Sequence, residues 1–206
     1  DRSQLTAMAQ QTKTTLQTDD LKVLADRGYF SGEEIMKCEQ AGVKPLVPKP
    51  LTNNAVTSGR FDKRDFHYDA KRDRYRCPAG EHAIWRFTSI QNGMAIRKYW
   101  SSACPKCAIR SDCTTGDYRR IMRWEHEAVI ERMQQRLDRM PQAGRLRRQT
   151  VEHTFGTLKS WMGATHFLTK RLPGVRTEMS LQVLAYNLKR VMQIMGVQPL
   201  IAAMRA

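Results

Sequence analysis

The chain has 206 residues, of which 41% are hydrophobic, enough for one domain, or one domain with an insertion, around a substantial core. Its formal net charge of +15 favours a polyanionic partner, because Lys and Arg displace condensed counterions from a phosphate backbone. A basic ribosomal-type or membrane-surface protein would have the same balance. However, no apolar run approaches the roughly 18 residues that span a bilayer, and "DRSQLTAMAQQTKTTLQ" lacks the apolar centre of a signal peptide. We therefore expect a cytoplasmic protein without a membrane partner.

The first fifty residues predict a helix followed by a strand–helix–strand unit, the building block of a mixed α/β sheet. The predicted elements are a helix over 3–17, a strand over 21–26, a helix over 31–42 and a strand over 43–48. In the second helix Ser31 can cap the N-terminus while Glu34 reaches back to it, and Gly42 marks the C-terminal stop. We take residues 1–50 as one core segment of an α/β domain.

Composition changes after residue 50. Residues 51–120 carry prolines, glycines, aromatics and the clustered cysteines, without a long helical pattern, which indicates an inserted, irregular or β-rich subdomain. Residues 121–206 predict three helices, over 121–140, 145–162 and 177–195. The last has an apolar face at helical spacing, formed by Leu181, Leu184, Leu188, Val191 and Met195.

Four cysteines of the insertion have spacings that suggest a structural zinc site. Cys104 and Cys107 form a Cys-x2-Cys pair, Cys113 follows closely, and Cys77 begins a knuckle-like "CPAG" turn. His82 is a spare ligand candidate. The alternative is a set of buried free thiols in a small subdomain. The fifth cysteine, Cys38, lies on a predicted helix, where we expect it in the core.

Two acidic residues could have a chemical role. Asp26 ends the first predicted strand, and ligands gather at the carboxyl ends of strands in α/β sheets, although the residue could simply begin a loop. Glu152 lies within the cationic run "RLRRQTVEHTFGTLKSWM". Helical spacing predicts one polar face, formed by Arg145, Arg148, Glu152, Gly156 and Lys159, and an adjacent inward apolar face, formed by Val151, Phe155, Leu158 and Met162. A magnesium ligand beside phosphate-binding cations would have this pattern, and so would ordinary helical ion pairs.

Several segments, in this order, resemble the DDE transposases of bacterial insertion sequences, which have an RNase H-like fold. They are "LKVLADRGYFSGEEI", "YRCPAGE", "CPKCAIRSDCT", "RRQTVEHTFGTLKSWMG" and "TEMSLQVLAYNLKR". The family's helix signature is Tyr-x2-Arg-x3-Glu-x6-Lys. Arg148, Glu152 and Lys159 match it, whereas Arg145 occupies the place of the tyrosine. The resemblance implies an RNase H-like mixed sheet, interrupted by the cysteine-containing and zinc-binding insertion.

The resemblance also implies the site and its chemistry. Asp26 and Glu152 would be the second and third catalytic acids and would bind Mg²⁺ or Mn²⁺, while Arg145, Arg148 and Lys159 would contact DNA phosphates. The substrates would be the terminal inverted repeats and target DNA, with self-association on DNA in a nucleoid-associated, cytoplasmic setting. The first catalytic aspartate would lie on a strand upstream of Asp1, which itself precedes a helix. We therefore expect the C-terminal portion of a transposase, with little or no strand transfer by this chain alone.

Three alternatives remain open at this stage. A non-catalytic zinc-ribbon DNA-binding protein would explain the charge and the cysteines but not the spacing of Arg148, Glu152 and Lys159. An RNase H-like nuclease of another kind, such as a resolvase, or an inactive transposase remnant would keep that spacing.

The basic segments "KRDRYR" and "YRRIMR" would either contact the DNA backbone or form a solvated face. We expect the aromatic residues among them to pack around a small core rather than to stack on bases.

Overall fold

The computed structural model describes residues 2–50 and 58–205, so Asp1 and the predicted start of the insertion at residue 51 lie outside the described part. The chain divides into two compact units, Asp1–Pro141 and Gln142–Ala206.

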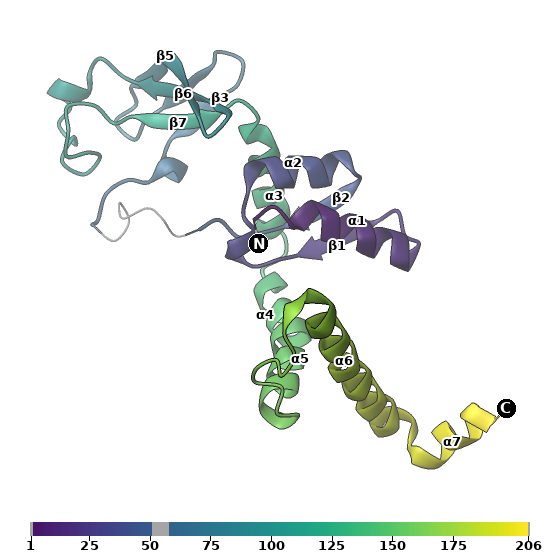
Figure 1. Ribbon diagram of the computed structural model, residues 1–206. Coiled ribbons are helices and arrows are strands. Elements are labelled where there is room, and N and C mark those ends of the chain that lie inside the picture. Colours follow the sequence, from purple (N-terminus) through teal and green to yellow (C-terminus); the bar gives the residue numbers. More distant parts are fainter. Residues whose placement is uncertain (1, 51–57, 206) are drawn as a thin grey trace. The chain divides into compact units, whose positions relative to one another are not determined.

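The first unit contains an α/β core built on two parallel strands. Strand β1 (Leu21–Leu24) pairs in register with β2 (Val43–Leu46), and helix α2 (Gly32–Gln40) connects them. Helices α1 (Leu5–Leu16) and α3 (Glu127–Asp138) gather around this strand pair (Figure 1). Their shared core contains Ile35, Val43, Val47 and Met133, all almost fully buried, together with Cys38 as predicted.

Local sequence signals explain the ends of α2. The Ser31 hydroxyl accepts a hydrogen bond from the Glu34 backbone N–H, and Gly42 adopts a φ of +71°, where a glycine is the favoured residue. The predicted capping box is wrong, because the Glu34 carboxylate does not return to the start of its own helix. It accepts from the backbone N–H of Thr6 at 3.0 Å and from Lys37 at 3.2 Å, and so ties α1 to α2.

The second part of the first unit is a five-stranded antiparallel sheet in the order β3-β4-β5-β6-β7. The strands are β3 (His67–Asp69), β4 (Arg74–Arg76), β5 (His82–Gln91), β6 (Met94–Trp100) and β7 (Ile121–Trp124). Short 3-10 turns η1 (Arg27–Tyr29), η2 (Lys63–Asp65) and η3 (Cys104–Lys106) complete the unit.

Strand β7 corrects the prediction of a helix from residue 121. Ile121, Arg123 and Trp124 are buried in the sheet, and the helix α3 begins only at Glu127. One face of the sheet covers a small core formed by Phe66, Tyr75, Ala83, Tyr99 and Ile121. Tyr75 and Tyr99 therefore pack in a small core as predicted, whereas Trp124 and Ile96 join the core of the α/β part.

A buried carboxylate ties the segment before the sheet to α3. Glu127 is 7% exposed, and its Oε1 accepts from Lys63 Nζ at 2.7 Å while its Oε2 accepts from the Trp124 backbone N–H at 3.2 Å. Burial by itself would raise the pKa of Glu127, but the positive charge of Lys63 and these hydrogen bonds lower it overall. The charged form is therefore the one that the fold stabilises.

We expect Glu127→Gln to lower the free energy of unfolding by about 1–3 kcal/mol at pH 7. Since the folded pKa lies below the unfolded value of about 4.3, the charged glutamate stabilises the fold above that pH, and its contribution is lost as pH falls through the folded pKa. Urea unfolding of both proteins from neutral to acidic pH should show the difference shrinking. The exposed Glu33→Gln serves as the control. A difference that does not change with pH would contradict this interpretation.

The second unit is helical. It comprises α4 (Ala143–Arg147), the π-helical turn η4 (Arg148–Glu152), α5 (His153–Gly156), a second π-helical turn η5 (Thr157–Trp161), α6 (Arg171–Met195) and α7 (Val197–Arg205). The predicted helices are confirmed, but α6 begins six residues earlier than expected. Its predicted apolar face is largely exposed, since no residue of α6 is buried.

The structure confirms the mixed α/β class. The described strands form a parallel pair and an antiparallel five-stranded sheet, and the RNase H-like arrangement remains a prediction. Within residues 2–50 and 58–205 no helix is long and apolar enough to cross a membrane.

Candidate functional site

Asp26 lies directly after β1, at the end where the two parallel strands present their carboxyl termini. Its Oδ1 accepts from the Gly28 backbone N–H at 2.8 Å and so caps the turn η1. A Cβ at Gly28 would lie 3.0 Å from that oxygen, so the glycine allows the close approach. The side chain is exposed, and among the described residues its second oxygen has no hydrogen-bond partner. Asp26 thus begins a loop and also offers one free carboxylate oxygen.

Glu152 lies at the end of the π-helical turn η4, and its side chain is about half exposed. The Glu152 carboxylate pairs with Arg147 and, within the described part of the chain, with no other cation. A π-helical turn brings residues five apart together, which explains this pair. Arg147 could not be predicted as this partner, because regular α-helical spacing pairs residues three or four apart and no sequence pattern marks a π turn.

The three cations that were predicted to share a face with Glu152 form no ion pair within the described part of the chain. Arg145, Arg148 and Lys159 are exposed, and the described residues offer them no carboxylate partner. A Cβ built at Gly156 meets no atom within 4 Å, so the helix surface there is open. Ordinary helical ion pairs therefore do not account for Arg145, Arg148 and Lys159.

The predicted apolar face of the same helix is only partly correct. Leu158 is buried as expected, but Val151 and Phe155 remain 42% and 46% exposed. Glu152 and Asp26 belong to different units, so their predicted convergence remains a prediction. Among the described residues, no three His, Cys, Asp or Glu side chains are placed to hold one metal ion.

Asp26 and Glu152 each suit a hard divalent cation, because carboxylate oxygens are the ligands that Mg²⁺ prefers. Each has one oxygen without a hydrogen-bond partner among the described residues. Each acid, taken by itself, therefore fits such an ion as a partial ligand.

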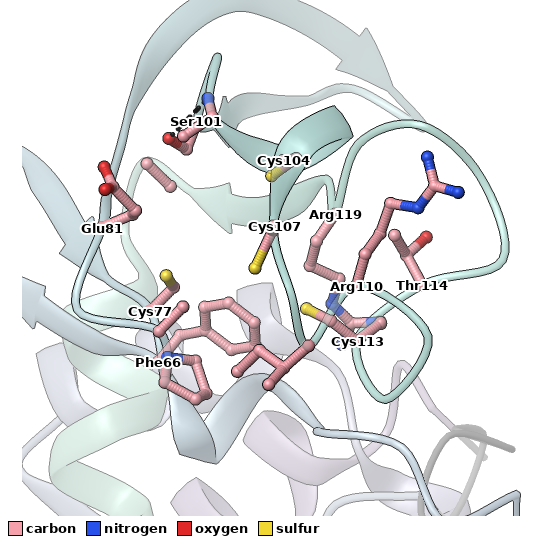
Figure 2. Close-up of a pocket in the computed structure, with 15 residues that line it drawn as sticks. Phe66, Cys77, Glu81, Ser101, Cys104, Cys107, Arg110, Cys113, Thr114 and Arg119 are labelled. Carbon is pink, nitrogen blue, oxygen red and sulfur yellow. Dashed lines mark hydrogen bonds between the residues drawn. The ribbon is translucent and has the colours of Figure 1, made fainter.

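The four cysteines of the insertion line one small pocket (Figure 2). Cys77 follows β4, Cys104 begins η3, Cys107 follows the end of η3, and Cys113 lies in the loop before β7. The space at the centre of the pocket is about 30 Å³, which holds one water-sized species. The insertion thus brings together four thiols from three separate segments.

Two tight turns present these thiols. Gly80 donates its backbone N–H to the Cys77 carbonyl at 2.9 Å with a φ of +83°, and Cys107 donates to the Cys104 carbonyl at 3.1 Å. Arg119 donates to the Cys113 carbonyl at 3.4 Å, and Arg110 lines the same pocket. Burial raises the pKa of the Cys113 thiol to about 11, although Arg119 lowers it in part. None of the four cysteines forms a disulfide bond. Within the described residues their side chains are not placed to hold one metal ion together. His82 is not among the lining residues.

The sequence of the chain matches the family model described as "Transposase DDE domain" over residues 76–192. This match covers more than half of the chain and includes the four pocket cysteines, Glu152 and the unpaired cations around it, but not Asp26. The chain therefore belongs to the transposase DDE domain family. Neither a curated protein nor a solved structure matches the chain.

Proposed function

We propose that this chain supplies catalytic residues for metal-dependent DNA cleavage and strand transfer in the transposition of an insertion sequence. The observation that carries the proposal is the exposed Glu152 carboxylate, which lies on a π-helical turn inside the family match and near cations without ion-pair partners. Interruptions of this kind in α-helices occur frequently at functional sites. A binding module would need only the cations and would have no use for this carboxylate.

In the proposed mechanism Asp26 and Glu152 would hold the divalent ion. When bound, such an ion supplies Lewis-acid activation of the attacking oxygen and stabilises the leaving oxygen. Arg147 orients the Glu152 carboxylate through their ion pair. Arg145, Arg148 and Lys159 hold the phosphates on either side of the reacting bond. Water loses a proton and bonds to phosphorus as the bond from that phosphorus to the 3′-oxygen breaks, and the released 3′-oxygen takes up a proton. The 3′-hydroxyl then loses its proton and bonds to a phosphorus of the target DNA, while the bond from that phosphorus to the target's own 3′-oxygen breaks and this oxygen takes up a proton.

The test is a cleavage assay on terminal-repeat DNA, with Mg²⁺ or with a chelator. It compares residues 1–206 with a chain extended upstream to include the first aspartate that the resemblance implies. We expect Mg²⁺-dependent nicking by the extended chain and little or none by residues 1–206. An extended chain that binds the DNA without cutting it would favour a DNA-binding protein or an inactive remnant.

The pairing of two DNA ends implies self-association on DNA, and access to the chromosome implies a nucleoid-associated location.

We also propose that the four pocket cysteines bind a structural Zn²⁺. The support is their convergence on one small space, with two tight turns presenting the thiols and Arg110 and Arg119 nearby to balance the charge of thiolates. The sulfur atoms would have to move closer together on binding, as expected where metal binding is coupled to local folding. The alternative is that the pocket keeps four free thiols.

We expect Cys77→Ser to lower the Zn²⁺ affinity of the chain by at least about tenfold, because it removes one of four thiolate ligands and leaves a hard oxygen in its place. The matched control is Cys38→Ser, which alters a buried cysteine in the other core. Titration with Cd²⁺, followed by thiolate-to-metal charge-transfer absorbance, reports the ligands directly. Equal loss in both variants, or no absorbance in the unaltered chain, would show that the four cysteines do not bind metal.

A further inference from the structure

The outer face of the five-stranded sheet carries aromatic rings covered by cations. Lys98 Nζ lies 5.0 Å from the centre of the Phe87 ring, and the guanidinium groups of Arg86 and Arg120 lie 5.5 and 5.8 Å from the centre of the Trp100 ring. We call this set, Arg86, Phe87, Lys98, Trp100 and Arg120, the cationic aromatic face. It is opposite the small core that holds Tyr75 and Tyr99.

Strand register explains why these residues share one side. Ile84 lies opposite Trp100, Phe87 opposite Lys98, and Lys98 opposite Met122, and directly opposed residues of antiparallel strands point to the same face. A register shift between Trp85 and Phe87 makes Arg86 the extra residue of β5 and directs it to Trp100. Ile96 and Trp124 of the same face are buried in the core of the α/β part, whereas Phe87 and Met122 remain 43% and 53% exposed, so the face is open at the cationic aromatic residues.

The three cations of this face have no acidic partner. Among the described residues none of Arg86, Lys98 and Arg120 has a carboxylate within ion-pair distance. Arg86 is held by neutral acceptors, the Ser102 hydroxyl at 2.6 Å and the Trp100 carbonyl at 3.3 Å. A ring holds a cation by its quadrupole without neutralising it, whereas a carboxylate would cancel the charge.

Three other cations of the same sheet form ion pairs with carboxylates, unlike the three cations of the cationic aromatic face. Arg97 pairs with Asp73, and the buried Arg123 pairs with Glu131. Arg74 pairs with Asp69 at the edge of the outer face. Carboxylates thus neutralise Arg74, Arg97 and Arg123, whereas the positive charge at the cationic aromatic face stays available to an anionic partner.

We propose that the cationic aromatic face binds the phosphate backbone of DNA, with Arg86, Lys98 and Arg120 as the contacting residues. The proposal rests on the proposed function, which makes DNA the substrate. Charge complementarity favours a polyanion over a protein partner, because the face presents three unneutralised cations. The rings fix the cations in place and reduce the side-chain entropy that is lost on binding.

The test measures the salt dependence of DNA binding by the full chain, with a fluorescently labelled random-sequence duplex and with its isolated single strand. The variant carries Arg86→Gln, Lys98→Gln and Arg120→Gln. The matched control loses three ion-paired cations of the α/β part through Lys37→Gln, Lys44→Gln and Arg132→Gln. Circular dichroism confirms that both variants fold.

For the duplex we expect the slope of log affinity against log salt to fall by about 2.7 in the face variant, since each phosphate contact contributes about 0.9. The control should keep the slope of the unaltered chain. The same loss with the single strand, at about 0.7 per contact, would extend the site to unpaired DNA. If all three proteins bind with equal slopes, the face is not a DNA contact while the proposed function still stands. If the unaltered chain binds no DNA at low salt, both proposals fail.

Discussion

Glu152→Gln is expected to lower Mg²⁺-dependent DNA cleavage by the extended chain by about a thousandfold, which corresponds to about 4 kcal/mol of transition-state stabilisation. Glutamine has nearly the same shape as glutamate but lacks the charge that a divalent ion requires. It would also lose the ion pair with Arg147, although the exposed helix should keep its fold. The measurement is the rate of nicking of terminal-repeat DNA under single-turnover conditions.

DNA affinity separates catalysis from binding in the same experiment. Removal of a negative charge beside Arg145, Arg148 and Lys159 should leave DNA binding unchanged or slightly stronger, because the phosphates no longer face a carboxylate. The matched control is Glu33→Gln, an exposed glutamate of α2 without an ion pair in the described structure. Cleavage by Glu152→Gln at the rate of this control would remove Glu152 from the catalytic residues.

The sequence allowed the prediction of those features that depend on neighbouring residues. The Ser31 cap, the glycine stop at Gly42 and the apolar strands β1 and β2 follow from local chemistry, and the structure confirms them. The tight turns that carry Cys77, Cys104 and Cys107 were also predictable, because a Cys-x2-Cys pair and a Cys-Pro turn are local signals.

Features that depend on tertiary contacts could not be predicted from neighbouring residues in the sequence. The segment from Ile121 to Trp124 was predicted to begin a helix, yet it is a strand in which Arg123 is buried and donates to Glu131 and to the distant Tyr75. The partner of Glu152 was missed because a π-helical turn shifts the spacing by one residue. The cationic aromatic face depends on the pairing of β5 and β6 and on the register shift at Arg86, neither of which has a sequence signal.

The second prediction with a large effect concerns the arginine that links the sheet to α3. Arg123 is 7% exposed, donates two hydrogen bonds to Glu131 at 2.5 and 3.1 Å and one to the Tyr75 hydroxyl at 3.3 Å, and lies 3.7 Å from the centre of the Tyr68 ring. These acceptors together raise the pKa of Arg123 despite its burial. The guanidinium therefore holds a helix and two tyrosines of the sheet in one cluster.

We expect Arg123→Leu to lower the free energy of unfolding by about 2–4 kcal/mol, because it leaves the buried Tyr75 hydroxyl without its partner and separates Glu131 from its cation. The matched control is Arg97→Leu, since Arg97 lies directly opposite Arg123 on the neighbouring strand, but its side chain is 45% exposed and pairs with Asp73, which is 42% exposed. That exposed pair should contribute no more than about 1 kcal/mol. Urea unfolding followed by circular dichroism compares the two variants. Equal losses of unfolding free energy in the two variants would mean that the burial of Arg123 adds no stability. The sheet and α3 would then be joined by their apolar contacts alone.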